Sequence, residues 1–197
     1  LRALHADLKS GGLAWADRLE GDYVPQAALR RADPNLLIYP HLGADGHFEI
    51  EDHGMDVVIQ HYLLREHGQV VVGPNPKSLI DPIEPDELRQ AAAGILQSWW
   101  APQLNDHTRL KSREYQAYAV LTMCRALYTM HFGAIASKPI AARWAAETLD
   151  SRLTPVIKNA LAWRLDVPAN DYLNETLDFI RLTLELCRQR PSSASTQ

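Results

Sequence analysis

The spacing of apolar and polar residues divides the chain near Pro85 into two parts. Before that proline, short apolar stretches alternate with turns, and "LLIYPHLGADGHFEIE" at residues 36–51 predicts a β-hairpin. Residues 55–67 carry apolar positions near helical spacing, and this pattern stops at Gly68. The stretches "RLEGDYV" and "QVVVGP" predict two further short strands, the second of them buried. The opening "LRALHADLKSGG" predicts a helix ended by a glycine pair.

Beyond Pro85 the pattern is helical. Five segments carry apolar stripes at helical spacing and are joined by short loops, which predicts a helical bundle: residues 86–100, 114–133, 138–149, 154–165 and 170–190. The final residues 191–197, "PSSASTQ", predict a disordered tail. We therefore expect an α+β protein with a mixed part over residues 1–84 and an all-helical bundle over residues 85–190.

Composition narrows the possible classes of function. The 197 residues are 46% hydrophobic and 22% charged, with a net charge of -4, so the chain lacks the basic field typical of nucleic-acid binding. No apolar run approaches the roughly 18 residues that cross a bilayer. The two cysteines, Cys124 and Cys187, lie in apolar helical patterns and indicate reduced core residues of a cytoplasmic protein.

Lys138 stands at an unusual position for a lysine. Ser137 and Pro139 on either side of it predict a helix start, because serine caps free N–H groups and proline suits the first turn. The positive end of the helix dipole disfavours a cation there. The residue is either an ordinary solvated lysine or a ligand for an anion.

Glu20 and Arg125 have two interpretations each. Glu20 lies in the expected strand "LEGDYV", where a carboxylate either protects a sheet edge or accepts a proton from a hydroxyl nucleophile. Arg125 lies at the border of the apolar side of its helix, where it is either a snorkelling or salt-bridged arginine or a phosphate ligand. The pattern alone leaves both choices open.

Two further residues are candidates for contact with a ligand. Trp99 and Trp100 end the first bundle helix, and adjacent tryptophans are commonly split between core and rim, so one of them is a candidate for stacking on a ligand. Glu114 is a first-turn acid that the helix dipole favours, and it is also suited to a polycationic substrate.

Known metal and catalytic motifs are absent from the sequence. The eight histidines include no common helical ligand pair, since His61 and His67 are six residues apart, and neither cysteine has a partner at zinc spacing. We therefore expect no metal-ligating set. "VVVGPNPKS" lacks the frame of a phosphate-binding P-loop, and no Gly-x-Ser-x-Gly motif occurs.

Residues 118–149, "YAVLTMCRALYTMHFGAIASKPIAARWAAETL", resemble the C-terminal domain of aminoglycoside adenylyltransferases of the streptomycin/spectinomycin type. The shared features are a helix with an internal Arg125, then Gly133, a helix start with Lys138, and the Ala-x-x-Trp-Ala run at residues 141–145. "LEGDYVP" is similar to the strand with the family's catalytic glutamate, and "VVVGPNPKSLIDPI" is similar to its linker. The resemblance covers most of the chain.

The resemblance implies a role for each candidate residue. Glu20 corresponds to the base that acts on the antibiotic hydroxyl, and Lys138 and Arg125 correspond to residues that bind the nucleotide phosphates. An acidic and aromatic substrate pocket would draw on Trp100, Asp106 and Glu114. The implied cofactors are ATP and Mg²⁺, and the implied reaction transfers AMP to an aminoglycoside hydroxyl, which gives antibiotic resistance.

The resemblance also implies parts that this sequence lacks. Residues 1–84 would be the C-terminal part of a polymerase-β-like nucleotidyltransferase domain, in which a Gly-Ser loop and an Asp-x-Asp strand precede the glutamate. Neither motif precedes Glu20. We therefore expect that upstream residues are missing and that the chain alone is inactive. The rival interpretation is a degenerate, non-catalytic bundle that binds a ligand or a partner.

Overall fold

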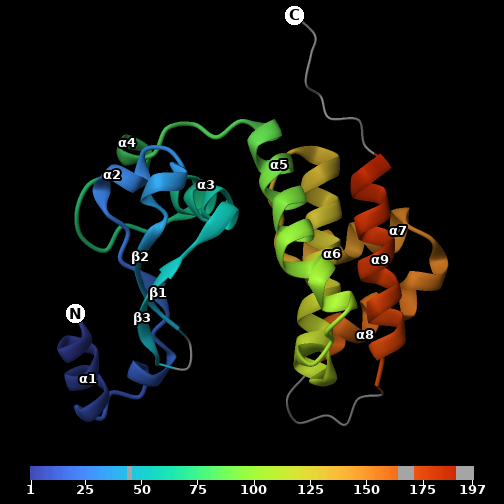
Figure 1. The fold of residues 1–197 in the computed structure, drawn as a ribbon, viewed down its shortest axis with the longest axis horizontal. Helices are drawn as coiled ribbons and strands as arrows, with labels where there is room; N and C mark the ends of the chain where they lie inside the picture. Colours follow the sequence, from blue (N-terminus) through green and yellow to red (C-terminus); the bar gives the residue numbers. More distant parts are fainter. Residues whose placement is uncertain (44–45, 164–170, 190–197) are drawn as a thin grey trace, which may run out of the picture. The chain divides into compact units, whose positions relative to one another are not determined.

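A computed structural model describes residues 1–43, 46–163 and 171–189 of the chain. The described residues are mostly helical with one small antiparallel sheet, which is compatible with the expected α+β class. Contacts within the chain divide it into two compact units, Leu1–Pro82 and Ile83–Gln197, called unit 1 and unit 2 below (Figure 1). The tail expected at residues 191–197 lies outside the described residues.

The sheet of unit 1 has three antiparallel strands in the order β1-β2-β3. β2 (Ile38–Leu42) and β3 (Phe48–Asp52) form the hairpin that the alternating pattern predicts. β1 consists only of Gly21–Asp22, and its two residues pair with Leu42 and His41 of β2. Most of the expected strand "RLEGDYV" is therefore outside the ladder.

The α-helices that accompany this sheet in the described part of unit 1 are α1 (Arg2–Ser10), α2 (Gln26–Leu29), α3 (Val57–His67) and α4 (Pro76–Leu79). α3 is confirmed over the residues with helical spacing, and it ends next to Gly68. The buried apolar side chains of the unit come from β2, α3 and the segments around them: Ala16, Ala28, Leu37, Tyr39, Leu42, Val57, Val58 and Ile80.

The buried strand predicted at "QVVVGP" is wrong. Val71 and Val72 are 93% and 92% exposed, and no described strand pairs with this segment. β-branched residues favour strands only where a neighbouring strand pairs with the backbone and a packed surface covers the side chains. This segment has neither among the described residues, and it ends at Gly73, whose φ of 104° breaks an extended strand.

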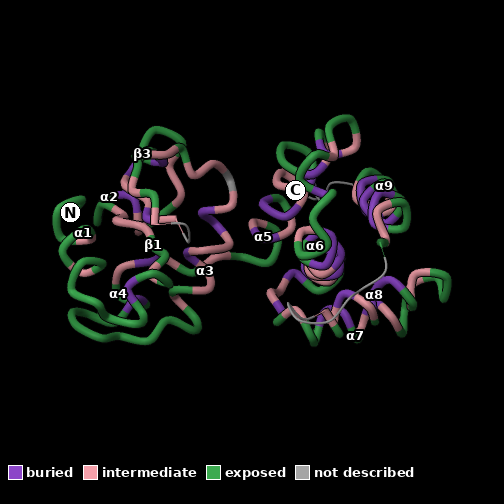
Figure 2. Tube along the Cα trace, turned by 90° about the horizontal axis from the view of Figure 1, so that it is seen from below, coloured by how far each residue is buried: buried purple, intermediate pink, exposed green. Residues whose placement is uncertain are grey.

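Unit 2 is built from helices, and its described residues contain no strand. Its main elements are α5 (Pro85–Ile95), a π-helical turn (Leu96–Trp100), α6 (Arg113–Phe132), α7 (Lys138–Thr148), α8 (Thr154–Ala162) and α9 (Leu173–Gln189). α6 packs against α5, α7, α8 and α9, and its buried positions lie among these neighbours (Figure 2).

The start of α5 and both ends of α6 follow standard capping rules. At the start of α5, Glu84 and Glu87 form a reciprocal capping box. Ser112 caps α6 by accepting a hydrogen bond from the backbone N–H of Tyr115 at 3.4 Å. α6 ends at Gly133, whose φ of 63° lies in the left-handed region that glycine adopts without strain. The chain then turns within four residues to reach Lys138 at the start of α7.

The core of unit 2 is continuous and apolar. Its fully buried side chains include Leu96, Trp100, Leu110, Val120, Met123, Cys124, Ile157, Phe179, Ile180 and Leu184. Among the described residues, no helix is both long enough and apolar enough to cross a bilayer.

Candidate functional site

Lys138 is the first residue of α7, as its neighbours predict. Ser137 occupies the N-cap position, but its side chain accepts no capping hydrogen bond. Pro139 has no N–H group, and the N–H of Ala141 donates to the backbone carbonyl of Ser137 at 3.0 Å. The N–H groups of Lys138 and Ile140 therefore have no side-chain acceptor among the described residues and are suited to an anion.

Arg125 of α6 brings a second positive charge close to Lys138. Burial lowers the pKa of Lys138, and the nearby charge of Arg125 lowers it further. Both side chains are partly buried, and neither forms an ion pair with a carboxylate of the described residues. Two partly desolvated cations of the same sign repel each other, so an anion placed between them is stabilised.

An aromatic cluster adjoins Lys138. The Nζ atom lies 4.8 Å from the centroid of the Tyr118 ring, a cation–π distance. Tyr118 also contacts Tyr115 and Trp100, with ring centroids 5.5 Å and 5.9 Å away. Tyr118 is 43% exposed, whereas Trp100 is 1% exposed. The cluster therefore extends from the core of unit 2 to its surface beside Lys138.

The two adjacent tryptophans are split between core and surface. Trp100 packs in the core, so a ligand reaches it only through a rearrangement of its neighbours. Trp99 is 44% exposed, donates a hydrogen bond from Nε1 to the Tyr115 hydroxyl at 3.2 Å, and has the Arg109 guanidinium over its ring at 5.1 Å. Trp99 is thus the tryptophan with accessible aromatic surface.

Asp106 and Glu114 are exposed carboxylates of unit 2. Asp106 accepts two hydrogen bonds from Thr108, from the hydroxyl at 2.7 Å and from the backbone N–H at 3.1 Å. These bonds hold the pKa of Asp106 below its usual value. Glu114 lies in the first turn of α6, where the helix dipole favours an acid.

Glu20 belongs to unit 1 and immediately precedes β1. Its side chain is exposed. Its negative charge contributes to raising the pKa of His41 in β2, the residue that pairs with Asp22. Glu20 is therefore an accessible carboxylate held beside a short ladder rather than within it.

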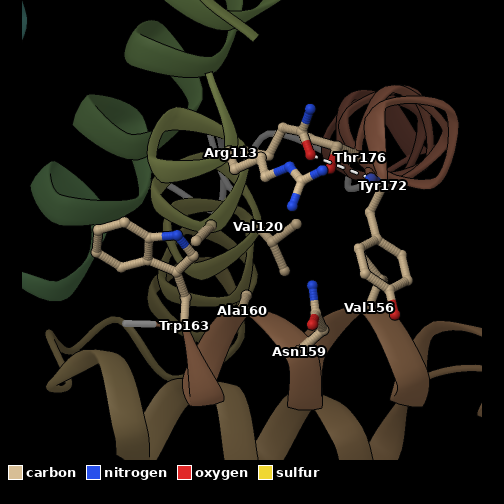
Figure 3. Close-up of a pocket in the computed structure, with 10 residues that line it drawn as sticks. Arg113, Val120, Val156, Asn159, Ala160, Trp163, Tyr172 and Thr176 are labelled. Atoms are coloured by element: carbon tan, nitrogen blue, oxygen red, sulfur yellow. Dashed lines mark hydrogen bonds between the residues drawn. The ribbon is translucent and has the colours of Figure 1, made fainter. Parts of the chain in front are cut away.

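A small crevice opens between α6, α8 and α9 (Figure 3). Arg113, Val120, Val156, Asn159, Trp163 and Thr176 are among the residues that line it. Its volume of about 10 Å³ accommodates one water molecule and excludes a sugar ring or a nucleotide. None of the candidate residues of the sequence lines this crevice.

Two groups of side chains come together that are not among the groupings expected from the sequence. The first group contains Tyr115 and Tyr118. Their spacing of three residues on one helix is the feature that could have predicted contact between the two rings. The expectation of no metal-ligating set rested on helical spacing. The fold of the sheet instead brings Asp22, His41 and His53 together. One possible ligand atom of each residue lies within 4.8 Å of those of the other two.

The fold and the cationic residues together indicate the kind of protein. The chain is an α+β protein with a small sheet in one unit and a helical bundle in the other, and the bundle carries a paired cationic site at a helix start. The family model described as "Aminoglycoside adenylyltransferase, C-terminal domain" matches residues 78–188. The chain therefore belongs to the aminoglycoside adenylyltransferase family.

Curated relatives carry the same family name. Proteins of Klebsiella pneumoniae and Escherichia coli, each named aminoglycoside (3'') (9) adenylyltransferase, are 33% identical over 117 residues, which is 58% of this chain and 41% of the relative. A protein of Rhizobium radiobacter with the same name is 29% identical over 147 residues, 69% of this chain and 50% of the relative. The matched part of the chain thus spans about half the length of these relatives.

Proposed function

We propose that the chain takes part in the transfer of AMP from Mg-ATP to a hydroxyl group of an aminoglycoside, with unit 2 binding the nucleotide phosphates. The family membership supports this reaction class, because the relatives are named adenylyltransferases of aminoglycosides. The observation that carries the proposal is the arrangement of Arg125 and Lys138 at the start of α7.

This arrangement has the properties of a phosphate site. Two cations from different helices lie close enough for the charge of one to lower the pKa of the other, and both are partly removed from water. The uncapped start of α7 adds backbone N–H donors and the positive end of the helix dipole. A polyphosphate would relieve the repulsion between the cations, and the planar guanidinium suits two phosphate oxygens at once.

Glu20 has the chemistry of a general base in this reaction. The hydroxyl oxygen of the acceptor attacks the α-phosphorus of ATP, and the bond from that phosphorus to the pyrophosphate oxygen breaks. The hydroxyl proton passes to the Glu20 carboxylate, and the products are the adenylylated sugar and pyrophosphate. The exposure of Glu20 supports this role, since a bulky sugar needs an accessible base.

Magnesium would neutralise phosphate charge in such a reaction. It prefers oxygen ligands in octahedral geometry. Among the described residues, the one group of three or more possible ligands contains two histidines, which do not suit magnesium. The 197 residues also contain no Asp-x-Asp motif. We therefore assign no residue of this chain to magnesium, and the roles of Glu20, Arg125 and Lys138 do not depend on a magnesium ligand from the described residues.

The aminoglycoside, which accepts the AMP group, would bind to carboxylates and aromatic side chains of unit 2. An aminoglycoside is a polycation rich in hydroxyl groups, so exposed carboxylates such as Asp106 and Glu114 attract it. Trp100 would contribute through the cluster that it forms with Tyr118 rather than by direct stacking, because its own ring is buried.

A thermal-shift screen of the purified chain against Mg-ATP and a panel of aminoglycosides tests this function. A ligand present at 100 times its Kd stabilises the folded state by about 2.7 kcal/mol, which raises the Tm measurably. We expect Mg-ATP to raise the Tm of the wild type and to have no effect on the double variant Arg125→Ala/Lys138→Ala. No shift with Mg-ATP would favour the rival function, a non-catalytic bundle that binds another partner.

A further inference from the structure

Three side chains of the kinds that ligate metal ions converge in unit 1. Asp22 of β1 is the direct cross-strand partner of His41 in β2. The Nδ1 atom of His41 lies 2.7 Å from Oδ1 of Asp22, and Nδ1 of His53 lies 3.7 Å from the same oxygen. The two imidazole rings meet edge to face, with centroids 5.8 Å apart.

The orientation of His53 is fixed by its other nitrogen. Nε2 of His53 lies 3.3 Å from the backbone carbonyl oxygen of Tyr39. A carbonyl only accepts hydrogen bonds, so Nε2 carries the proton, and in the neutral ring Nδ1 carries a lone pair. The His53 ring also stacks on Tyr39, with centroids 3.8 Å apart and an interplanar angle of 10°. Metal-ligating histidines are oriented in this way, by a hydrogen bond from the nitrogen that does not bind the metal.

The Nδ1 atom of His53 faces the Asp22 carboxylate. The His53 side chain is only 6% exposed, and the separation of 3.7 Å is too far for a hydrogen bond. A cation between a partly buried carboxylate and an imidazole nitrogen is stabilised by both groups. The surroundings add negative potential, since Asp56 acts on both Asp22 and His53, and Glu20 and Glu51 act on His41.

The ligand set selects the kind of ion. Two imidazoles and one carboxylate suit divalent transition metals such as zinc or cobalt, whereas magnesium and calcium require oxygen ligands. Zinc bonds of 2.0–2.1 Å to nitrogen and oxygen place tetrahedral ligand atoms roughly 3.3 Å apart. The separations of 2.7 Å and 3.7 Å bracket that value, so small side-chain movements bring all three atoms to bonding distance.

We propose that Asp22, His41 and His53 bind a divalent transition-metal ion of the zinc class. When the ion binds at Nδ1 of His41, the ring proton of that residue moves to Nε2. Three protein ligands leave a fourth position open, as in zinc sites that exchange water or bind a substrate group. The ion would also tie the short β1, which directly follows Glu20, to β2 and to the segment after β3.

Cobalt and zinc titrations of the metal-free chain test this site. We expect one equivalent of Co²⁺ to bind and to give the visible absorption of a four- or five-coordinate ion, with Zn²⁺ displacing it and excess Mg²⁺ leaving it bound. Calorimetry with Zn²⁺ should show an affinity loss of about 100-fold or more in His53→Ala and Asp22→Asn, since even the loss of a residue that orients a ligand costs 10–100-fold. His67→Ala, an exposed histidine of α3, is the matched control and should bind as the wild type does.

A measurement on the wild type keeps the test decisive if a ligand variant fails to fold. Diethyl pyrocarbonate modifies accessible imidazole nitrogens, and peptide mapping by mass spectrometry locates the modified residues. We expect Zn²⁺ to protect His41, whose side chain is 23% exposed, from modification and to leave the exposed His67 reactive. Binding that survives both ligand substitutions, protection that is equal at His67, or no binding of either metal would overturn the proposal.

Discussion

Gly133 ends α6 and begins the turn that delivers Lys138 to the start of α7, so its replacement by alanine tests how this part of unit 2 is built. Its φ of 63° costs an alanine roughly 1–2 kcal/mol. An added Cβ would lie 2.5 Å from Cβ of Pro85 and 2.8 Å from a terminal nitrogen of Arg89. The arginine end can move, but the ring of Pro85 is held in the first turn of α5.

The backbone strain at positive φ and the close contact of the added Cβ are separate costs of Gly133→Ala, and a control variant can separate them. Overpacking of a close contact costs about 1–3 kcal/mol. Alanine also lowers the conformational entropy of the unfolded chain relative to glycine, which stabilises the folded state by about 0.4–1 kcal/mol. The net effect for Gly133→Ala is a loss of about 1–4.5 kcal/mol, set against the roughly 5–15 kcal/mol that stabilises a typical domain. Arg89 would also lose its hydrogen bond from Nε to the Met130 carbonyl, now 3.2 Å long, if it swings away.

Gly12→Ala is the matched control for the backbone term. Gly12 has a φ of 68°, and no atom lies within 4 Å of the position that its Cβ would take. Urea denaturation followed by tryptophan fluorescence measures both variants, since four of the five tryptophans lie in unit 2 and Trp15 lies in unit 1. We expect Gly133→Ala to lose more stability than Gly12→Ala by the overpacking term. Equal losses would refute the close approach of α5 to the end of α6.

Three further predictions concern buried groups and activity. His61 is 3% exposed, its Nε2 has no hydrogen-bond partner in the described part of the chain, and burial lowers its pKa, so the unfolded chain takes up a proton there as the pH falls below about 6.5. The wild type should therefore lose more stability than His61→Leu between pH 7.5 and pH 5.5 in urea titrations, and parallel losses would exclude His61 as the source. Burial raises the pKa of Cys124 to about 12, so iodoacetamide should label this thiol at neutral pH only after unfolding, and labelling of the native chain would contradict its burial. The 197 residues contain no Asp-x-Asp motif, so we expect no transfer of AMP from α-labelled ATP to any aminoglycoside by this chain alone, and a labelled product would refute that expectation.

The helices of unit 2 follow directly from local rules in the sequence. Apolar positions at helical spacing, Ser112 before α6 and Gly133 after it are signals that act within a few residues. The hairpin of β2 and β3 is equally local, because its two strands are joined by a short turn. "QVVVGP" misleads because a strand needs a partner, and whether one lies alongside depends on distant parts of the chain.

The candidate site was predictable only in part for the same reason. The position of Lys138 at a helix start is a local property, and the sequence indicates it. Its proximity to Arg125 and Tyr118 depends on how α6 packs against α7, which no spacing along the chain specifies. The convergence of Asp22 and His41 likewise depends on the register between β1 and β2, which joins residues 19 positions apart.

The most direct test of the nucleotide site is a calorimetric titration of Mg-ATP into the wild type, Lys138→Ala and Lys158→Ala. Lys158 is an exposed lysine of α8 and serves as the control. Loss of a charge-assisted phosphate contact costs about 1.5–3 kcal/mol, so the Kd of Lys138→Ala should rise about 10- to 150-fold. Two opposing effects change the stability of Lys138→Ala without ligand. Loss of the cation–π contact with Tyr118 destabilises the variant by about 0.5–1 kcal/mol. Removal of a cation beside Arg125 and the positive end of the helix dipole stabilises it. The free variant should therefore stay within about 1 kcal/mol of the wild type, because each of these opposing effects is at most about 1 kcal/mol. An unchanged Kd in Lys138→Ala, or a wild type that does not bind Mg-ATP, would contradict the phosphate role of this helix start.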